Sequence, residues 1–220
     1  MSLSIDDTAP DFEVDTTEGR IRLHDWIGNQ WAVLFSHPTD FTPVCTSEHG
    51  CMAKAKPAFD KRGAKIIGLS VDPVNQHADC ASGIEETRGF APNYPIISDR
   101  DFKVSKLYGM LPVAKSGDAA KRTPARNQTV RNVFVIGPDK KIKLVLVYPM
   151  TTGSNFDEML RVIDFSLQLT AKHKVATPVD WKQGEEVSVV GLVTDKEVDA
   201  VRSRMDYERL AGWRGEWPLP

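Results

Sequence analysis

The stretch from Trp31 to Gly50, WAVLFSHPTDFTPVCTSEHG, constrains the fold more than any other part of the sequence. Residues 31–35 form a short apolar run without a charge, which is typical of a strand covered on both faces. Pro38 ends that strand, because proline has no N–H to donate to a sheet. Thr42 and Pro43 then start a helix, with a hydroxyl N-cap followed by proline at the first helical position.

Cys45 is the residue that this helix start singles out. Counting from the Thr42 cap places it at the third helical position, where free backbone N–H groups and the helix dipole favour a thiolate. Most cysteines are small buried hydrophobes, so the position carries more weight than the residue type. The next cysteine, Cys51, lies roughly 9 Å further along such a helix, beyond the ~7 Å Cα limit for a disulfide. Cys80 is not excluded by sequence distance, although a free helix cysteine is its simpler interpretation.

Four further apolar runs predict strands at residues 64–71, 94–98, 131–137 and 141–148. The strand at 94–98 is expected at a sheet edge, because it contains Pro95. Helices are expected at residues 43–61, 72–87, 102–108 and 155–169. This order predicts an α/β fold in which helices cover both faces of a mixed central sheet.

Three segments are less regular. Residues 5–20 are expected to form a loop or a short hairpin around Gly19, and residues 21–27 a short strand or a docking turn. Residues 111–129 form a long loop, and such loops more often act as functional lids than as spacers.

The composition changes after Thr170. The last fifty residues hold three of the five tryptophans and few aliphatic residues, which is too little for a large core of their own. We therefore expect a main domain at residues 1–169. A smaller C-terminal domain at 170–220 would then dock on it or on a partner subunit.

Charge and composition exclude several function classes. The net charge is −2, so a nucleic-acid partner is not expected, and no apolar run approaches the roughly 20 residues that span a membrane. The N-terminal residues lack the features of a signal or transit peptide, and an odd count of three cysteines suits a reducing compartment, so a cytoplasmic protein is expected. The five histidines show no ligand spacing with the cysteines, so we do not expect a metal site.

Pro38, Thr42 and Cys45 together read PxxxTxxC, and the flanking SHPTDFTPVCTSE resembles the active-site signature of the peroxiredoxins. The likeness is greatest to their one-cysteine (peroxiredoxin 6-type) subfamily. Further similar segments follow in the same order, namely RNVFVIGPDKKIKL from Arg131, LVYPMTTGSNFDEMLRVIDFSLQLT from Leu146 and VATPVDW from Val175. The resemblance implies a thioredoxin-like fold with a C-terminal arm, no cofactor, and an arm-swapped homodimer or a larger homo-oligomer.

The same resemblance implies a thiol-dependent peroxidase. Cys45 as a thiolate would attack hydrogen peroxide or an organic hydroperoxide and become a sulfenic acid. An external thiol such as glutathione or thioredoxin would then reduce it, because no resolving cysteine lies nearby. The alternative is a redox sensor or oligomeric holdase that is switched by oxidation of Cys45.

The resemblance also assigns roles to the residues around Cys45. The Thr42 hydroxyl would accept from the thiol side and donate to a peroxide oxygen, while Pro38 would shield the sulfur. Arg131 would be an always-charged donor to the sulfur and the leaving oxygen. Without the motif it would be a solvent-facing charge at a strand end. Glu48, at i+3 from Cys45, would orient that arginine or be a solvated helix carboxylate. His37 would either tune the pocket or simply pack.

Two positions depart from the family pattern. Many peroxiredoxins carry a second arginine in a TTGRN segment, where this chain has Ser154. Some one-cysteine members carry a phospholipase serine in a GDSWG motif, and the matching residues 28–31 here read GNQW. Phospholipase activity is therefore not expected, and the missing arginine leaves the tuning of the thiolate open.

Overall fold

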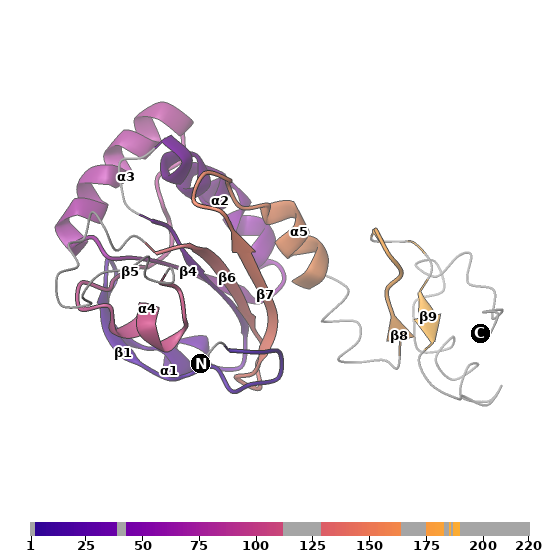
Figure 1. Cartoon of the computed structure of the whole chain (residues 1–220). Coiled ribbons are helices and arrows are strands. Elements are labelled where there is room, and N and C mark those ends of the chain that lie inside the picture. Colours follow the sequence, from indigo (N-terminus) through magenta and orange to yellow (C-terminus); the bar gives the residue numbers. More distant parts are fainter. Residues whose placement is uncertain are drawn as a thin grey trace. The chain divides into compact units, whose positions relative to one another are not determined.

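The computed structural model of the chain describes residues 3–38, 43–111, 129–163, 175–182, 185 and 187–189. The chain divides into two compact units, residues 1–156 and 157–220 (Figure 1). The division expected at residue 169 stays a prediction. None of the helices in the described ranges is long and apolar enough to cross a membrane.

A seven-stranded sheet forms the first unit, in the order β2-β1-β5-β4-β3-β6-β7. Its strands are β1 (Glu13–Thr16), β2 (Gly19–Arg22), β3 (Trp31–Ser36), β4 (Ala64–Ser70), β5 (Ile96–Ser98), β6 (Arg131–Ile136) and β7 (Ile142–Tyr148). β4 pairs in parallel with β3 and β5, and the other pairings are antiparallel. The expected mixed α/β sheet is therefore confirmed.

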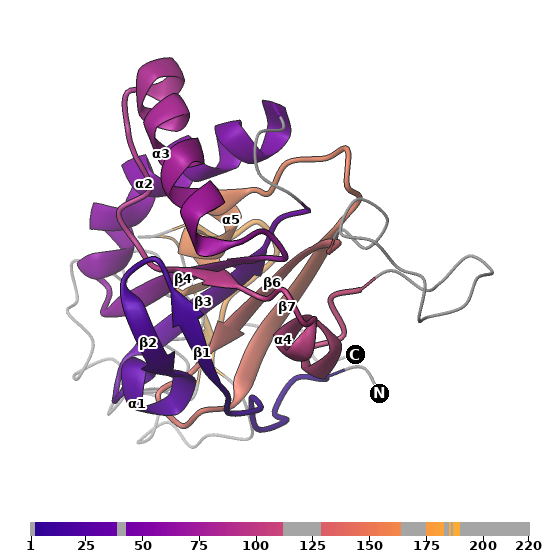
Figure 2. The same cartoon turned by 90° about the vertical axis from the view of Figure 1, so that its left-hand side faces the viewer.

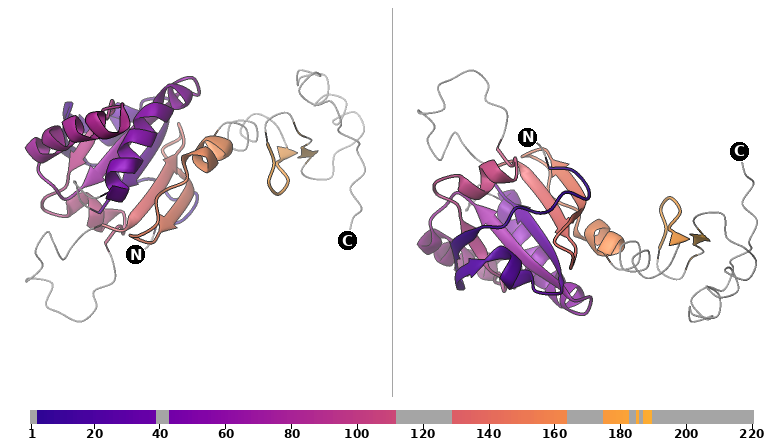
Figure 3. Two further views of the ribbon diagram at one scale, coloured as in Figure 1. Left: turned by 90° about the horizontal axis from the view of Figure 1, so that it is seen from above. Right: turned by 90° about the horizontal axis from the view of Figure 1, so that it is seen from below.

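Helices cover both faces of this sheet, as expected. The five helices of the described residues are α1 (Leu23–Ile27), α2 (Pro43–Asp60), α3 (Val74–Arg88), α4 (Lys103–Leu107) and α5 (Phe156–Arg161). α2 and α3 pack side by side on one face (Figure 3). α1 and α4 lie on the opposite face (Figure 2). The second unit contains the short antiparallel pair β8 (Val175–Ala176) and β9 (Ser188–Val189).

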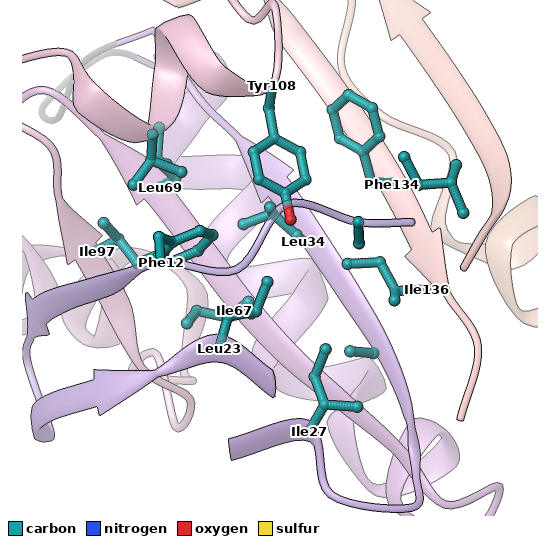
Figure 4. Close-up of a cluster of buried hydrophobic side chains, with 14 of the residues drawn as sticks. Phe12, Leu23, Ile27, Leu34, Ile67, Leu69, Ile97, Tyr108, Phe134 and Ile136 are labelled. Carbon is teal, nitrogen blue, oxygen red and sulfur yellow. The ribbon is translucent and has the colours of Figure 1, made fainter. Parts of the chain in front are cut away.

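The core lies on the face of the sheet that α1 and α4 cover (Figure 4). Leu34, Ile67 and Phe134 enter it from three neighbouring strands and are fully buried or nearly so. Tyr108, which ends α4, packs its ring edge-on against Phe134 and donates a hydrogen bond from its hydroxyl to Pro10 O, at 2.7 Å. The hydrophobic core thus occupies one face of the sheet, and Cys45 lies on α2, which covers the other face.

Two expectations about the N-terminal half are wrong. β5 is not an edge strand, because the hairpin of β1 and β2 adds to the sheet beyond it and pairs Thr16 with Ile97. Pro95 precedes the first residue of β5, so its missing N–H removes no ladder bond, and its carbonyl accepts from Gly68 N at 3.0 Å. Residues 23–27 form the helix α1 instead of a strand or turn, because Leu23 and Ile27, one helical turn apart, are both fully buried.

Other expectations fall partly outside the described residues. Residues 112–128 of the expected lid are not described, so the lid stays a prediction. The expected helix at 155–169 is described as α5 up to Arg161, and residues 164–170 are not described.

Candidate active site

α2 places Cys45 where the sequence predicts it. The helix begins at Pro43, so Cys45 is its third residue, and the side chain is only 1% exposed. Thr42, the expected N-cap, lies outside the described residues. Cys45 therefore sits in the first turn of an eighteen-residue helix, where the N-terminal end of the helix dipole favours a negative charge.

Arg131 reaches Cys45 from the neighbouring part of the sheet. β3 and β6 run antiparallel with Phe35 opposite Val133, so the end of β3 meets the start of β6 at Arg131. The Nη2 of Arg131 lies 3.6 Å from Cys45 Sγ, and its Nε donates to Met150 O at 3.0 Å. The residue is 2% exposed, so the interpretation as a solvent-facing charge is wrong.

Glu48 holds the other side of this arginine. Its Oε2 forms an ion pair with Arg131 Nη1, and its Oε1 accepts from Ser154 N at 2.8 Å. The Glu48 side chain is 3% exposed, so the interpretation of Glu48 as a solvated helix carboxylate is also wrong. At the position of the absent second arginine, it is the backbone of Ser154 that contacts Glu48.

The electrostatics of this group follow from its burial. Arg131 and Glu48 cancel one another in net charge, and a thiolate at Cys45 adds one negative charge in a poorly solvated place. Burying an ion without a compensating charge costs on the order of several kcal/mol. The guanidinium of Arg131 lies 3.6 Å from that sulfur, so this site can compensate a negative charge there better than an apolar site of equal burial could.

His37 and Pro38 are both buried at the end of β3. The backbone N of His37 donates to Leu69 O at 3.0 Å, and Thr129 Oγ1 donates to His37 O at 2.7 Å. The Nε2 of His37 lies 3.3 Å from the Nε2 of His49. His49 was not expected at the site, although its spacing of four residues from Cys45 places it on the same helical face.

The remaining cysteines and histidines of the described ranges form neither a disulfide nor a metal site. Cys51 is exposed, Cys80 is buried, and none of the three cysteines forms a disulfide within the described residues. No group of three or more His, Cys, Asp or Glu in the described part of the chain is arranged to hold a metal ion. The arrangement therefore offers thiol chemistry at Cys45, with Arg131 and Glu48 beside it.

Comparison with known families agrees with this chemistry. Residues 5–145 match the AhpC/TSA family, and residues 166–203 match the C-terminal domain of 1-Cys peroxiredoxin. The chain is 51% identical to peroxiredoxin-6 of Rattus norvegicus over 199 residues, which is 89% of this chain and 86% of the relative. It is 50% identical to peroxiredoxin-6 of Homo sapiens over 199 residues, with the same coverage.

Solved structures show the same fold. The C45S mutant of the peroxiredoxin 6 of Arenicola marina superposes with a TM-score of 0.81 at 45% identity, covering 90% of this chain and 89% of that one. A yeast mitochondrial 1-Cys peroxiredoxin gives 0.80 at 45% identity, covering 90% and 92%. These matches do not favour the redox-sensor or holdase alternative. The chain belongs to the AhpC/TSA family and, within it, to the one-cysteine peroxiredoxins, which are thiol-dependent peroxidases.

Proposed function

We propose that Cys45 is the residue that reduces peroxide and that Arg131, Glu48 and Pro38 form its immediate setting. The observation that supports this most is the 3.6 Å approach of Arg131 Nη2 to a buried Cys45 Sγ. Glu48 and the carbonyl of Met150 fix the same guanidinium from two other directions. A preorganised cation of this kind stabilises a charge that develops during a reaction.

In the proposed reaction the Cys45 thiolate attacks the terminal oxygen of a hydroperoxide. The S–O bond forms as the O–O bond breaks, so sulfur is oxidised and the peroxide is reduced. The leaving oxygen takes up a proton and departs as water or an alcohol, and Cys45 becomes a sulfenic acid. Arg131 would stabilise the leaving oxygen, Thr42 would donate to the peroxide, and Pro38 would keep competing donors away from the sulfur.

An external thiol then restores Cys45. It attacks the sulfenic sulfur, water leaves with the hydroxyl oxygen, and a mixed disulfide forms that a second thiol reduces. Cys51 is exposed on α2 while Cys45 is buried, so an internal disulfide between them would need the helix to unwind. One structural relative is described in terms of thiol resolution through glutathione and thioredoxin systems, and we propose one of these as the reductant.

The C-terminal part of the chain is proposed to mediate assembly. Residues 166–203 match the C-terminal domain of 1-Cys peroxiredoxin, which supports a separate domain at 170–220. We propose that this domain serves as the arm of a homodimer or a larger homo-oligomer. A cytoplasmic location is proposed on the composition alone.

Stopped-flow measurement of Cys45 oxidation by hydrogen peroxide tests the proposal. The wild-type protein should react orders of magnitude faster than an ordinary free thiol, and Cys45→Ser should abolish peroxide consumption. Cys51→Ser and Cys80→Ser are matched controls that should keep the oxidation step. A wild-type rate near that of a free thiol would sink the proposal.

Intact-mass spectra after peroxide treatment, with and without glutathione, test the reductant. A mixed disulfide at Cys45 supports an external thiol. An internal disulfide that disappears in Cys80→Ser would instead show that the one-cysteine mechanism is wrong.

A further inference from the structure

A chain of buried polar rings lies beside the site and has no role in the reaction described so far. His37 directly follows β3, His49 lies on α2 and Tyr94 precedes β5, and all three residues are at most 2% exposed. The Nδ1 of His49 is 2.7 Å from Tyr94 Oη, and its Nε2 is 3.3 Å from His37 Nε2. The two imidazole rings meet edge to face, with centroids 4.4 Å apart.

This chain is tied to the two elements that build the site. His49 lies one helical turn after Cys45 on α2 and directly follows Glu48. The carbonyl of His37 accepts from Thr129, which lies two residues before Arg131. The pair formed by His37 and His49 therefore bridges the helix that holds the sulfur and the strand that holds the arginine.

The geometry limits how many protons the pair holds. In its neutral form, the Tyr94 hydroxyl donates to His49 Nδ1, and His49 Nε2–H donates to His37 Nε2. After one more proton binds, His49 Nδ1–H donates to the Tyr94 oxygen, and the contact between the two histidines is kept. A second added proton would set two N–H groups against each other. This geometry accommodates one added proton on the pair and opposes a second.

Tyr94 suits both states of the pair, because a hydroxyl is a donor and an acceptor. Burial raises the pKa of Tyr94 well above its usual value, and the negative charge of Glu48 raises it further. The phenol therefore keeps its proton throughout the pH range in which histidine titrates.

The net charge of the site is consistent with one added proton on the pair. Arg131 and Glu48 sum to zero, and Ser154 contacts Glu48 through its backbone N–H, which carries no net charge. Ionisation of Cys45 leaves this buried group with one negative charge. One proton on the histidine pair returns the sum to zero.

We propose that the His37–His49 pair binds one proton as Cys45 loses one, and that His49 and Tyr94 are positioning residues that make this possible. This inference rests on the proposed role of Cys45. The Cys45 S–H bond breaks, an N–H bond forms on the pair, and no electron is transferred. The thiolate that attacks the peroxide is then matched by a charge on a neighbouring imidazole.

Two other buried titratable groups belong to the elements packed against the pair. His77 faces it from α3, with its ring centroid 6.1 Å from that of His37. β4, which pairs with β3, is followed two residues after its end by the buried carboxylate of Asp72, which accepts from Ser70 Oγ at 3.1 Å. These two groups are the alternative places for the proton, so a test has to separate them from His49.

Thiolate absorbance measured against pH is the main readout, because it needs no peroxidase activity. His49→Gln keeps a hydrogen-bonding side chain but cannot take up a proton, so ionisation should move to higher pH. We expect a shift of about one pH unit, which is about a tenfold smaller thiolate fraction on the acid side. Tyr94→Phe removes only a hydroxyl and should shift the curve in the same direction by less.

His24→Gln is the matched control. His24 lies on α1, on the opposite face of the sheet, and its Nε2 is 2.8 Å from Ala9 O, so its removal should leave the titration unchanged. An unchanged curve in both His49→Gln and Tyr94→Phe would overturn the proposal. So would a shift that His77→Gln produces and His49→Gln does not.

The rate of Cys45 oxidation in the same variants separates this inference from the function on which it rests. A pH profile that shifts with the thiolate titration supports both. A slow wild-type reaction, together with shifted titrations in the variants, would reject the peroxidase role and keep the proton-binding pair. Thermal unfolding of each variant checks that the fold is intact.

Discussion

The same kind of ion pair occurs in two regions of this molecule with opposite surroundings. At the site, Arg131 and Glu48 are 2% and 3% exposed, while in the N-terminal hairpin Arg20 and Glu13 are 63% and 56% exposed. Water and salt screen the hairpin pair, so it adds little to stability. The site pair has lost its solvation, so each partner depends on the other. The difference shows that burial, more than the type of pair, determines what an arginine and a carboxylate contribute.

The largest expected effect is at the buried pair. Arg131→Leu leaves Glu48 buried without its counter-charge and should lower the free energy of unfolding by about 3–5 kcal/mol. The double variant Arg131→Leu/Glu48→Leu should recover most of that loss, because two apolar side chains need no compensation. Denaturant unfolding of the two variants measures both values. A double variant no more stable than the single one would contradict this account of the pair.

A conservative change at the same arginine should affect the reaction more than the fold. Arg131→Lys keeps the charge but loses the planar fork that spans Cys45, Glu48 and Met150. Losing one preorganised donor should slow Cys45 oxidation on the order of 10²-fold. Stopped-flow rates at a fixed pH measure this, with Lys65→Arg as a control far from the sulfur. A wild-type rate in Arg131→Lys would mean that charge alone is sufficient.

A smaller effect is expected at Asp11, whose exposed fraction lies between those of the buried pair and the hairpin pair. Its carboxylate is 22% exposed and accepts from Phe12 N, His24 N and Arg22 Nε. Asp11→Ala removes the hydrogen bond to the first turn of α1 and should cost about 1–2 kcal/mol of unfolding free energy.

The loss at Asp11 should depend on pH. Burial raises the pKa of Asp11, but hydrogen bonds from the His24 backbone and the Arg22 side chain outweigh it, so the pKa lies below the usual 3.8. The carboxylate therefore stabilises the fold fully above that value, and the contribution is lost as the pH falls through the folded-state pKa. Unfolding curves of wild type and Asp11→Ala should differ near neutral pH and converge in acid. A constant difference would point to lost packing instead.

The smallest effect is expected at the exposed pair of the hairpin. Glu13 accepts from Arg20 across β1 and β2, and this hydrogen bond is the largest cause of the lowered pKa of Glu13. Arg20→Ala should nevertheless leave the melting temperature within experimental error, and added salt should remove any remaining difference. A clear, salt-resistant destabilisation would show that this surface pair behaves like the buried one.

Local patterns in the sequence predict the central part of the fold. The apolar runs predict β3, β4, β6 and β7 to within a residue or two, because polar residues, glycine or proline flank each run. Thr-Pro predicts the start of α2, and with it the helical position of Cys45, because a helix start depends only on neighbouring residues.

Contacts between distant residues could not be predicted in this way. β5 is interior because a hairpin some eighty residues earlier pairs with it, and no local pattern around Pro95 contains that information. Arg131 and Glu48 are 83 positions apart, and His49 and Tyr94 are 45 apart. The resemblance of the segment from Arg131 to the family pattern is what marks this arginine, whereas nothing in the sequence marks Tyr94 as a partner of His49.

The contrast between Cys51 and Cys45 has a practical consequence for labelling. A bulky maleimide reaches the exposed sulfur of Cys51 before the buried one, so a total thiol count after a short reaction reports the wrong cysteine. The same order of access makes Cys51 a natural attachment point for a fluorophore. Such a dye would sit on the helix that carries Cys45, roughly 9 Å of helical rise away, and would report oxidation there without modifying the reacting sulfur.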